Sequence, residues 1–321
     1  MIPFVKTHGL GNDFILVEKA QGIPSDYSDF ARRICDRHFG IGADGLILWN
    51  RAGDIFKVRI FNQDGSEAEC SGNGLRCAAA HLMQSGRWAE DEIRMETVSG
   101  MYTLRRVGGE YEADMGEPKL APKDIPFVTA APIERVVNYQ LTADGQSFTV
   151  TACSTGNPHC SVFVDQLEDA YVEKIGSLLE RHSAFPNRTN VELIRVLNRS
   201  EIEVRFWERG VGHSNASGTG SCGATVASIL TGKTDRKVTV HAKAGTLIVE
   251  WQQNGRLKLT STANIVAPSR AWPAVFSSAP APSTASSRPS KLTAIAGSRS
   301  ASSGGPRRPA PRGWTFSCSG G

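Results

Sequence analysis

Hydrophobic and polar residues alternate along this chain over many short stretches, which is the pattern of β-strands with one buried face. Four longer stretches instead carry apolar residues at helical spacing and end near Gly, Ser or His, so they are predicted to be helices. The predicted strands are 14–17, 45–48, 57–61, 102–106, 161–164, 201–206, 238–241, 246–251 and 258–260, and the predicted helices are 29–37, 75–84, 171–181 and 221–230. The pattern indicates a mixed α/β fold dominated by sheet.

The composition changes at Pro268. Ser, Ala, Pro and Gly make up 36 of the 54 residues in 268–321, and this segment has seven basic and no acidic residues. Such a segment buries too little apolar surface to offset its ordering entropy, so a disordered tail is predicted. The tail also explains the net charge of +4, because residues 1–267 carry 29 basic against 32 acidic residues. The charge therefore gives no support for nucleic-acid binding.

An internal repeat is the most informative feature of the chain. Ser71-Gly72-Asn73-Gly74 opens one predicted helix, and Ser217-Gly218-Thr219-Gly220 opens another 146 residues later. The same spacing places Asn62 over Glu208, and a spacing of 145 places Asn12 over Asn157. These matches predict a duplication, with an N-terminal half at 1–118, a C-terminal half at 119–267 and the tail at 268–321. Each half is expected to be mostly β-sheet with a central helix.

Both repeats place glycines directly at a helix N-terminus. The free backbone N–H groups and partial positive charge of a helix N-terminus favour anions, and glycine lets the backbone approach a ligand closely. One such turn alone is more often a serine N-cap. Two matched copies that face each other suit a carboxylate held from both sides, with Ser71 and Ser217 opposed across it. Opposed proton donors and acceptors around one carbon are what a racemase or epimerase needs.

The motifs of residues 1–267 resemble those of the diaminopimelate epimerase family. The resemblance rests on HGLGNDF (8–14), DRHFGIGADG (36–45), FNQDGS (61–66), GNGLRC (72–77), GNPH (156–159), ERGVG (208–212) and SGTG (217–220). It implies two pseudo-symmetric α/β domains, each a barrel-like, mostly antiparallel sheet around a central helix, with the site between them. It also implies cofactor-independent interconversion of LL- and meso-diaminopimelate by two-base proton transfer at the α-carbon, in lysine and peptidoglycan precursor biosynthesis.

The resemblance assigns roles residue by residue. It implies that Ser71 and Ser217 occupy the two catalytic positions and that His159 and Glu208 tune them. The implied clasp on the carboxylate of the reacting centre is Gly72, Asn73, Gly218 and Thr219. The implied recognition set for the rest of the substrate is Asn12, Asn62, Asn157, Asn190 and Arg209, with Glu208 also in contact.

The sequence departs from the family at both catalytic positions, because the family has a cysteine where Ser71 and Ser217 stand. A serine hydroxyl is far less acidic than a thiol and needs a strong neighbouring base. Three hypotheses follow: an epimerase that uses the serines, an isomerase on the same scaffold with another substrate, and a non-catalytic amino-acid-binding protein. The retained Asn12, Asn157 and Arg209 favour the first, while the loss of both thiols is the main support for the third.

The other residues suggest no further chemistry. Cys77, Cys160 and Cys222 are predicted to be core thiols, Cys70 a small half-buried residue, and Asp44 and Asp64 turn-stabilising residues. No metal-ligand spacing or phosphate-binding loop is present, so neither a metal nor a cofactor is predicted. No apolar run approaches the ~18 residues of a membrane span, and a cytoplasmic location is expected. The predicted partner is a small amino-acid substrate, and the oligomeric state is open, with a homodimer as one option.

Overall fold

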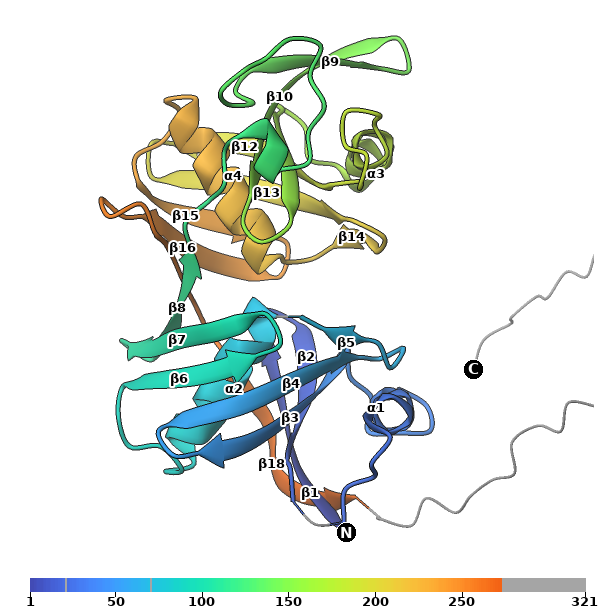
Figure 1. Ribbon diagram of the computed structural model, residues 1–321, viewed down its shortest axis with the longest axis vertical. Helices are drawn as coiled ribbons and strands as arrows, with labels where there is room; N and C mark the ends of the chain where they lie inside the picture. The colour runs from blue at the N-terminus through green and yellow to red at the C-terminus, as the bar shows by residue number, and fades with distance from the viewer. Residues whose placement is uncertain (21, 70, 273–321) are drawn as a thin grey trace, which may run out of the picture. The chain divides into compact units, whose positions relative to one another are not determined.

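The computed structural model describes residues 1–20, 22–69 and 71–272, except for the side chains of 268–272. These residues belong to one compact unit, in which two similar halves are joined by paired strands (Figure 1). Cys70 and residues 273–321 lie outside the described residues, and so do the predictions made for Cys70 and for that part of the tail.

In the first half, two antiparallel hairpins are each followed by one parallel strand pairing. Strand β1 pairs antiparallel with β2, β2 parallel with β3, β3 antiparallel with β4, and β4 parallel with β6. Strands β6, β7 and β8 then form an antiparallel meander, and β5 adds a short edge to β4. The elements are β1 (Ile2–Gly9), β2 (Asn12–Glu18), α1 (Tyr27–Cys35), β3 (Gly45–Ala52), β4 (Ile55–Asn62), β5 (Glu67–Ala68), α2 (Gly72–Gln84), β6 (Glu92–Thr97), β7 (Gly100–Val107) and β8 (Glu110–Gly116).

The second half repeats this pairing strand for strand. Strands β10, β11, β12, β13, β15, β16 and β17 take the places of β1, β2, β3, β4, β6, β7 and β8, with the parallel steps at the same points. The elements are η1 (Pro122–Asp124), β9 (Tyr139–Ala143), β10 (Gln146–Ser154), β11 (Pro158–Phe163), α3 (Asp169–Glu180), β12 (Asn190–Asn198), β13 (Glu201–Glu208), β14 (Gly212–Ser214), α4 (Gly218–Leu230), β15 (Lys237–Ala242), β16 (Gly245–Trp251), β17 (Leu257–Ser261) and β18 (Asn264–Trp272). The predicted duplication and the mixed α/β class are confirmed.

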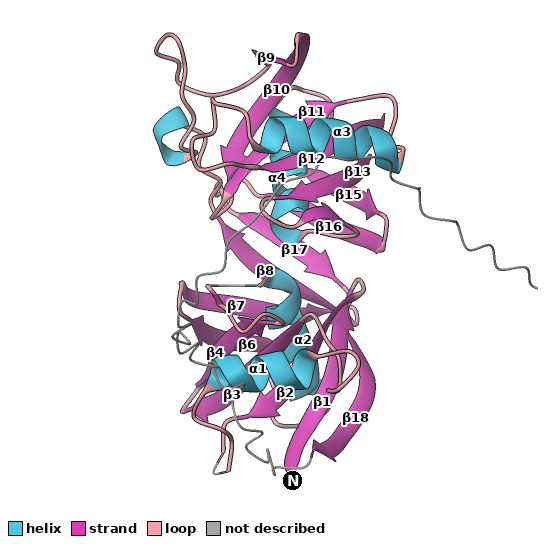
Figure 2. Ribbon diagram, turned by 90° about the vertical axis from the view of Figure 1, so that its right-hand side faces the viewer, coloured by secondary structure: helices cyan, strands magenta, loops and turns pink. Residues whose placement is uncertain are grey.

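Each half wraps its sheet around one helix. Helix α2 packs against β1, β2, β7, β8 and β18, and α4 packs against strands of the second half from β10 to β17. Most residues of a helix enclosed in this way must be small or apolar, and both helices are rich in small buried residues, mainly Ala, Gly and Cys in α2 and Ala, Gly, Ser and Cys in α4. Helices α1 and α3 cover the outer faces of the two sheets (Figure 2). Helices α2 and α4 contact each other, so the centres of the two halves meet.

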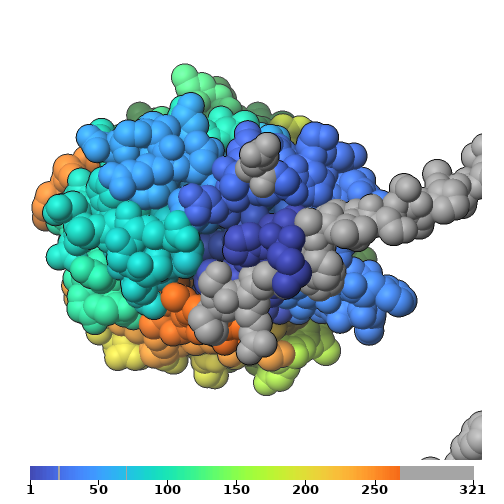
Figure 3. Space-filling view, turned by 90° about the horizontal axis from the view of Figure 1, so that it is seen from below, coloured from blue at the N-terminus to red at the C-terminus, as the bar shows by residue number. Residues whose placement is uncertain are grey.

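The last described strand corrects one prediction. Strand β18 follows the second half in sequence but pairs antiparallel with β1, from Ile2↔Trp272 to His8↔Asn264. Figure 3 shows the two segments side by side, in dark blue and orange. The tail was expected to begin at Pro268, yet the strand continues through Trp272. Pro268 is accommodated because β18 is an edge strand whose register shifts opposite Val5, where no ladder N–H is required.

All nine predicted strands overlap observed strands, and all four predicted helices are present with ends shifted by at most a few residues. Nine further strands were missed: β1, β5, β6, β8, β9, β10, β12, β14 and β18. Several of these, such as β1, mix polar and apolar residues without regular alternation, and they are strands because a neighbour pairs with them.

Candidate active site

Ser71 and Ser217 have the same local structure. Each is the N-cap of its helix with extended backbone angles, φ −142° and ψ 115° at Ser71 and φ −136° and ψ 126° at Ser217. The Oγ of Ser71 accepts from the backbone N–H of Gly74 over 3.1 Å, and the Oγ of Ser217 accepts from Gly220 over 3.2 Å. Each hydroxyl oxygen therefore lies in the positive field of a helix N-terminus, and its proton is left for another acceptor.

The glycines of these turns are required by close packing. A Cβ on Gly220 would lie 2.8 Å from Cδ1 of Phe206, and one on Gly74 would lie 3.2 Å from Cδ1 of Ile47. Phe206 and Ile47 are core residues of the surrounding sheets, so neither can move aside easily. The glycines of these two turns are therefore needed for close packing, whether or not a ligand binds beside them.

A cavity of about 730 Å³ joins the two helix N-termini. Both halves line it, and both serines face it. Of the residues proposed from sequence, those that line it are Asn12, Asn62, Ser71, Gly72, Asn73, Asn157, Glu208, Ser217, Gly218 and Thr219. The cavity is large enough for a small amino acid and presents amides, hydroxyls and three carboxylates, those of Asp44, Asp64 and Glu208.

Three of the proposed residues are not part of this lining. His159 is buried beneath Asn157, and its Nε2 is 2.8 Å from Oδ1 of Asn157. Asn190 is also buried: its Nδ2 donates to the carbonyl of Pro158 over 2.9 Å, and its Oδ1 accepts from the backbone N–H of Arg209 over 2.9 Å. Arg209 is exposed, and its guanidinium donates to the carbonyl of Asn187 over 3.2 Å.

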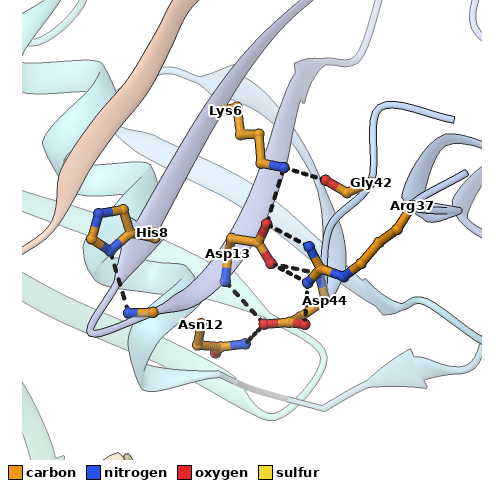
Figure 4. Close-up of polar contacts among 8 residues, drawn as sticks. Lys6, His8, Asn12, Asp13, Arg37, Gly42 and Asp44 are labelled. Carbon is orange, nitrogen blue, oxygen red and sulfur yellow. Dashed lines mark hydrogen bonds and ion pairs between the residues drawn. The ribbon is translucent and has the colours of Figure 1, made fainter. Parts of the chain in front are cut away.

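A cluster of charged side chains supports Asn12, and one of them, Asp44, also lines the cavity (Figure 4). The Nδ2 of Asn12 donates to Oδ2 of Asp44 over 2.9 Å, and Arg37 bridges Asp44 and Asp13 with contacts of 2.7 and 2.8 Å. Lys6 lies 3.0 Å from Asp13. Burial would raise the pKa of Asp13, but the hydrogen bonds from Arg37 and Lys6 outweigh it and hold that pKa below its usual range. Asp44 therefore orients a cleft residue as well as stabilising its turn.

Arg76 places a positive charge inside the protein next to the clasp. The residue is fully buried in α2, and one of its nitrogens donates to Oδ1 of Asn73. Among the described residues, its Nε and Nη1 have no hydrogen-bond partner. Burial lowers its pKa to about 10, so it is charged at neutral pH. The sequence analysis gave no role to Arg76, although an arginine as the fifth residue of a helix rich in small and apolar residues is itself a signal.

The described cysteines do not replace the missing thiols. Cys35, Cys77, Cys153, Cys160 and Cys222 are all free and buried, which confirms the predicted core positions of Cys77, Cys160 and Cys222. Burial raises the pKa of Cys77 to about 11 and that of Cys222 to about 12, so both are protonated thiols at neutral pH.

Within residues 1–20, 22–69 and 71–272, no group of three or more His, Cys, Asp or Glu side chains is arranged to hold a metal ion. In that same part of the chain, no helix is long and apolar enough to cross a membrane.

Known structures share this fold at low sequence identity. A hydroxyproline epimerase from Agrobacterium vitis matches with a TM-score of 0.57 at 14% identity, covering 84% of this chain and 90% of that one. A PhzF-family phenazine biosynthesis protein from Bacillus anthracis matches with a TM-score of 0.59 at 17% identity, covering 83% and 97%. The chain therefore has the duplicated fold found in these proteins.

Sequence comparison is more specific. The family model described as diaminopimelate epimerase matches residues 4–121 and 151–266. The diaminopimelate epimerase of Pelotomaculum thermopropionicum is 46% identical over 272 residues, covering 82% of this chain and 96% of the relative. That of Synechocystis is 45% identical over 270 residues, covering 83% and 97%. The chain belongs to the diaminopimelate epimerase family.

Proposed function

We propose that this protein is a cofactor-independent isomerase that interconverts LL- and meso-diaminopimelate in lysine and peptidoglycan precursor biosynthesis. Membership of the family supports the reaction class and the substrate. One structural observation supports it most directly: two equivalent helix N-termini, each capped by a serine, open into one cavity.

In the proposed reaction, the carboxylate of the reacting centre lies between the backbone N–H groups of the clasp: Gly72, Asn73, Gly218 and Thr219. One serine accepts the α-proton, and the electron pair left on the α-carbon spreads onto the carboxylate. The helix N-termini and the charge of Arg76 stabilise that developing negative charge. The opposite serine then donates its proton to the other face of the carbon, which inverts the centre and leaves the two serines with exchanged protonation states.

The serines make this reaction harder than it is with thiols. A hydroxyl oxygen that accepts an N–H at a helix N-terminus is stabilised when it becomes negative, which favours deprotonation. Glu208 supplies a carboxylate in the same cavity that can receive a proton through a serine. Both features support turnover at these positions.

The second candidate is a non-catalytic amino-acid-binding protein. The two serines favour it, because the buried thiols offer no substitute base. An isomerase acting on another substrate is the third. In all three, the ligand is a small amino acid, and Asn62, Asn190 and Arg209 are proposed to recognise the part remote from the reacting carbon.

The deciding experiment is incubation of the purified full chain with LL-diaminopimelate, followed by chiral separation of the products. Formation of the meso isomer supports the epimerase. Calorimetric binding without conversion supports the binding protein, and neither binding nor conversion supports the third candidate.

Four other features are part of the proposal. We place the division between the halves at 118/119 and the protein in the cytoplasm, with a homodimer as one assembly option. We propose no nucleic-acid partner. Size-exclusion chromatography with light scattering tests the assembly.

A further inference from the structure

A buried polar chain leads from the core of the second half to the cleft. Nδ1 of His159 lies 2.6 Å from Oε1 of Glu192, and its Nε2 lies 2.8 Å from Oδ1 of Asn157. The side chains of His159 and Glu192 are 0% and 1% exposed, whereas Asn157 lines the cavity. Ser161 donates to the second carboxylate oxygen over 3.3 Å. Glu192 plays no part in the proposed reaction, so its presence in the core needs a reason.

The first half shows that the fold does not require this pair. In that half, Phe14 aligns with Gly45 and Leu16 with Ile47 in the parallel pairing of β2 with β3. The matching pairing of β11 with β12 aligns His159 with Asn190 and Ser161 with Glu192. His159 thus stands where the first half has Phe14, and Glu192 where it has Ile47. Burying an acid and a base costs more than burying two apolar side chains, so the polar pair points to a task other than folding.

The geometry around His159 leaves its ring one orientation. A Cβ on Gly223 of α4 would lie 2.9 Å from Cβ and Cγ of His159, so the helix backbone packs directly against it. Glu192 and Asn157 then engage the two ring nitrogens from opposite sides. The ring can neither flip nor withdraw without losing a buried contact.

The proton distribution follows from the two partners. Burial raises the pKa of Glu192, while the adjacent His159 lowers it in part. Oδ1 of Asn157 can only accept, so its contact with Nε2 of His159 requires a proton on that nitrogen. The contact at Nδ1 holds one further proton: on Oε1 it makes Nδ1 the acceptor of a neutral ring, and on Nδ1 it makes an imidazolium–carboxylate pair. While Nε2 keeps its proton, the amide of Asn157 directs Oδ1 toward the ring and its nitrogen away from it.

We propose that Glu192 is a positioning residue: by engaging Nδ1 of His159 it keeps a proton on Nε2, which fixes the amide of Asn157 with its N–H groups toward the cleft. The inference rests on the proposed function only in taking the ligand to be an amino acid. A flipped amide would present its oxygen to a ligand carboxylate and repel it.

The test compares Glu192→Gln with the wild type. A glutamine at this position either donates to Nδ1 or accepts from it, so both ring tautomers become accessible. Selective ¹⁵N labelling of His and Asn, with His159→Gln and Asn157→Ser for assignment, reports by NMR which ring nitrogen is protonated and whether the Asn157 amide resonances move. The control is Glu201→Gln, which breaks another His–Glu pair of this half, with His241 at 2.9 Å.

We expect a protonated Nε2 in the wild type and a tautomer mixture with shifted Asn157 amide resonances in Glu192→Gln. The Kd and KM for LL-diaminopimelate should rise about 3- to 10-fold, with kcat changed by less than about twofold. Glu201→Gln should show none of these effects. If Glu192→Gln does not fold, the test uses Glu192→Ile, which introduces the residue type found at the equivalent position, Ile47, of the first half. The same His159 and Asn157 resonances and the same Kd are then measured on this variant.

Unchanged His159 and Asn157 resonances in a folded variant would overturn the proposal, as would a changed tautomer with an unchanged Kd. If the wild type neither binds nor converts diaminopimelate, the proposed function fails, while the ring and amide resonances still decide the role of Glu192.

Discussion

The side-chain amide of Asn73 donates to Oδ1 of Asn12 over 3.2 Å, and this contact joins the proposed carboxylate clasp to the proposed recognition set. Charges fix the orientation of both amides. Arg76 can only donate, so Oδ1 of Asn73 faces it, and Asp44 can only accept, so Nδ2 of Asn12 faces it. Each amide keeps one N–H for a ligand, and the chain of contacts presents donors to the cavity.

Asp44→Asn should therefore weaken substrate binding without unfolding the protein. The new amide can donate as well as accept, so Asn12 is no longer held in one orientation. We expect the Kd for LL-diaminopimelate to rise about 3- to 10-fold by calorimetry. Asp91→Asn is the control, because it removes another aspartate–arginine pair, with Arg106 at 2.6 Å, outside the cavity lining. Equal affinities in both variants would show that Asp44 only stabilises its turn.

Features of the site that depend on local sequence could be predicted, and features that depend on tertiary pairing could not. The caps at Ser71 and Ser217 are visible in the sequence because a serine and two glycines before a small, apolar helix determine them. Glu192 was missed because its partner His159 is 33 residues away and is reached only through the parallel pairing of β11 with β12. The end of the fold at Trp272 was missed for the same reason, because β18 is a strand only beside β1.

Arg209→Ala should lower affinity more than stability. The side chain is exposed and donates only to the carbonyl of Asn187 among the described contacts, so its loss disturbs little packing. A charge-assisted contact with a substrate carboxylate is worth roughly 1.5–3 kcal/mol, so the Kd should rise about 10- to 150-fold. Arg199→Ala, at an exposed arginine paired with Asp235, is the control. An unchanged Kd would remove Arg209 from the recognition set.

Removing β18 should destabilise the first half. A chain ending at Ala263 loses the pairing along β1 and the contact of Ile265 with the core around α2. We expect Tm to fall by at least about 6 °C, from a loss of roughly 3 kcal/mol. A chain ending at Phe276 keeps this strand and should melt within about 2 °C of the full chain. Equal melting of the two truncated chains would contradict a structural role for β18.

His81 should make stability depend on pH above the range in which carboxylates act. Burial, with a smaller contribution from Arg87, lowers the pKa of His81 to about 4. Between pH 6.5 and 4 the unfolded chain binds the proton and the folded chain does not, so the free energy of unfolding falls as pH falls, by roughly 2–3 kcal/mol. His81→Gln should flatten this part of the curve in urea titrations, whereas His38→Gln, at an exposed position, should not. The same slope in His81→Gln would assign it to another group.

Isotope exchange and paired substitutions test the two serines. Turnover in D₂O should place deuterium on the α-carbon, because the returning proton comes from a solvent-exchanged hydroxyl. Ser→Ala at either position should suppress epimerisation strongly. Ser→Ala also removes a helix N-cap, which lowers the stability of the protein by about 1 kcal/mol, whereas Ser→Gly lowers it by only a few tenths. Glycine variants that are stable but inactive would therefore show that the serines are needed for the reaction and not only for capping.

Ser→Cys at both positions should preserve or raise the rate, because a thiolate forms far more easily at neutral pH. Two outcomes would change the assignment. If the double alanine variant keeps full activity, the serines are only N-caps, and Glu208, which shares their cavity, becomes the leading candidate base. If the wild type is inert and the double cysteine variant turns over, the scaffold is competent, and the natural protein binds its amino acid without epimerising it or acts on a different substrate.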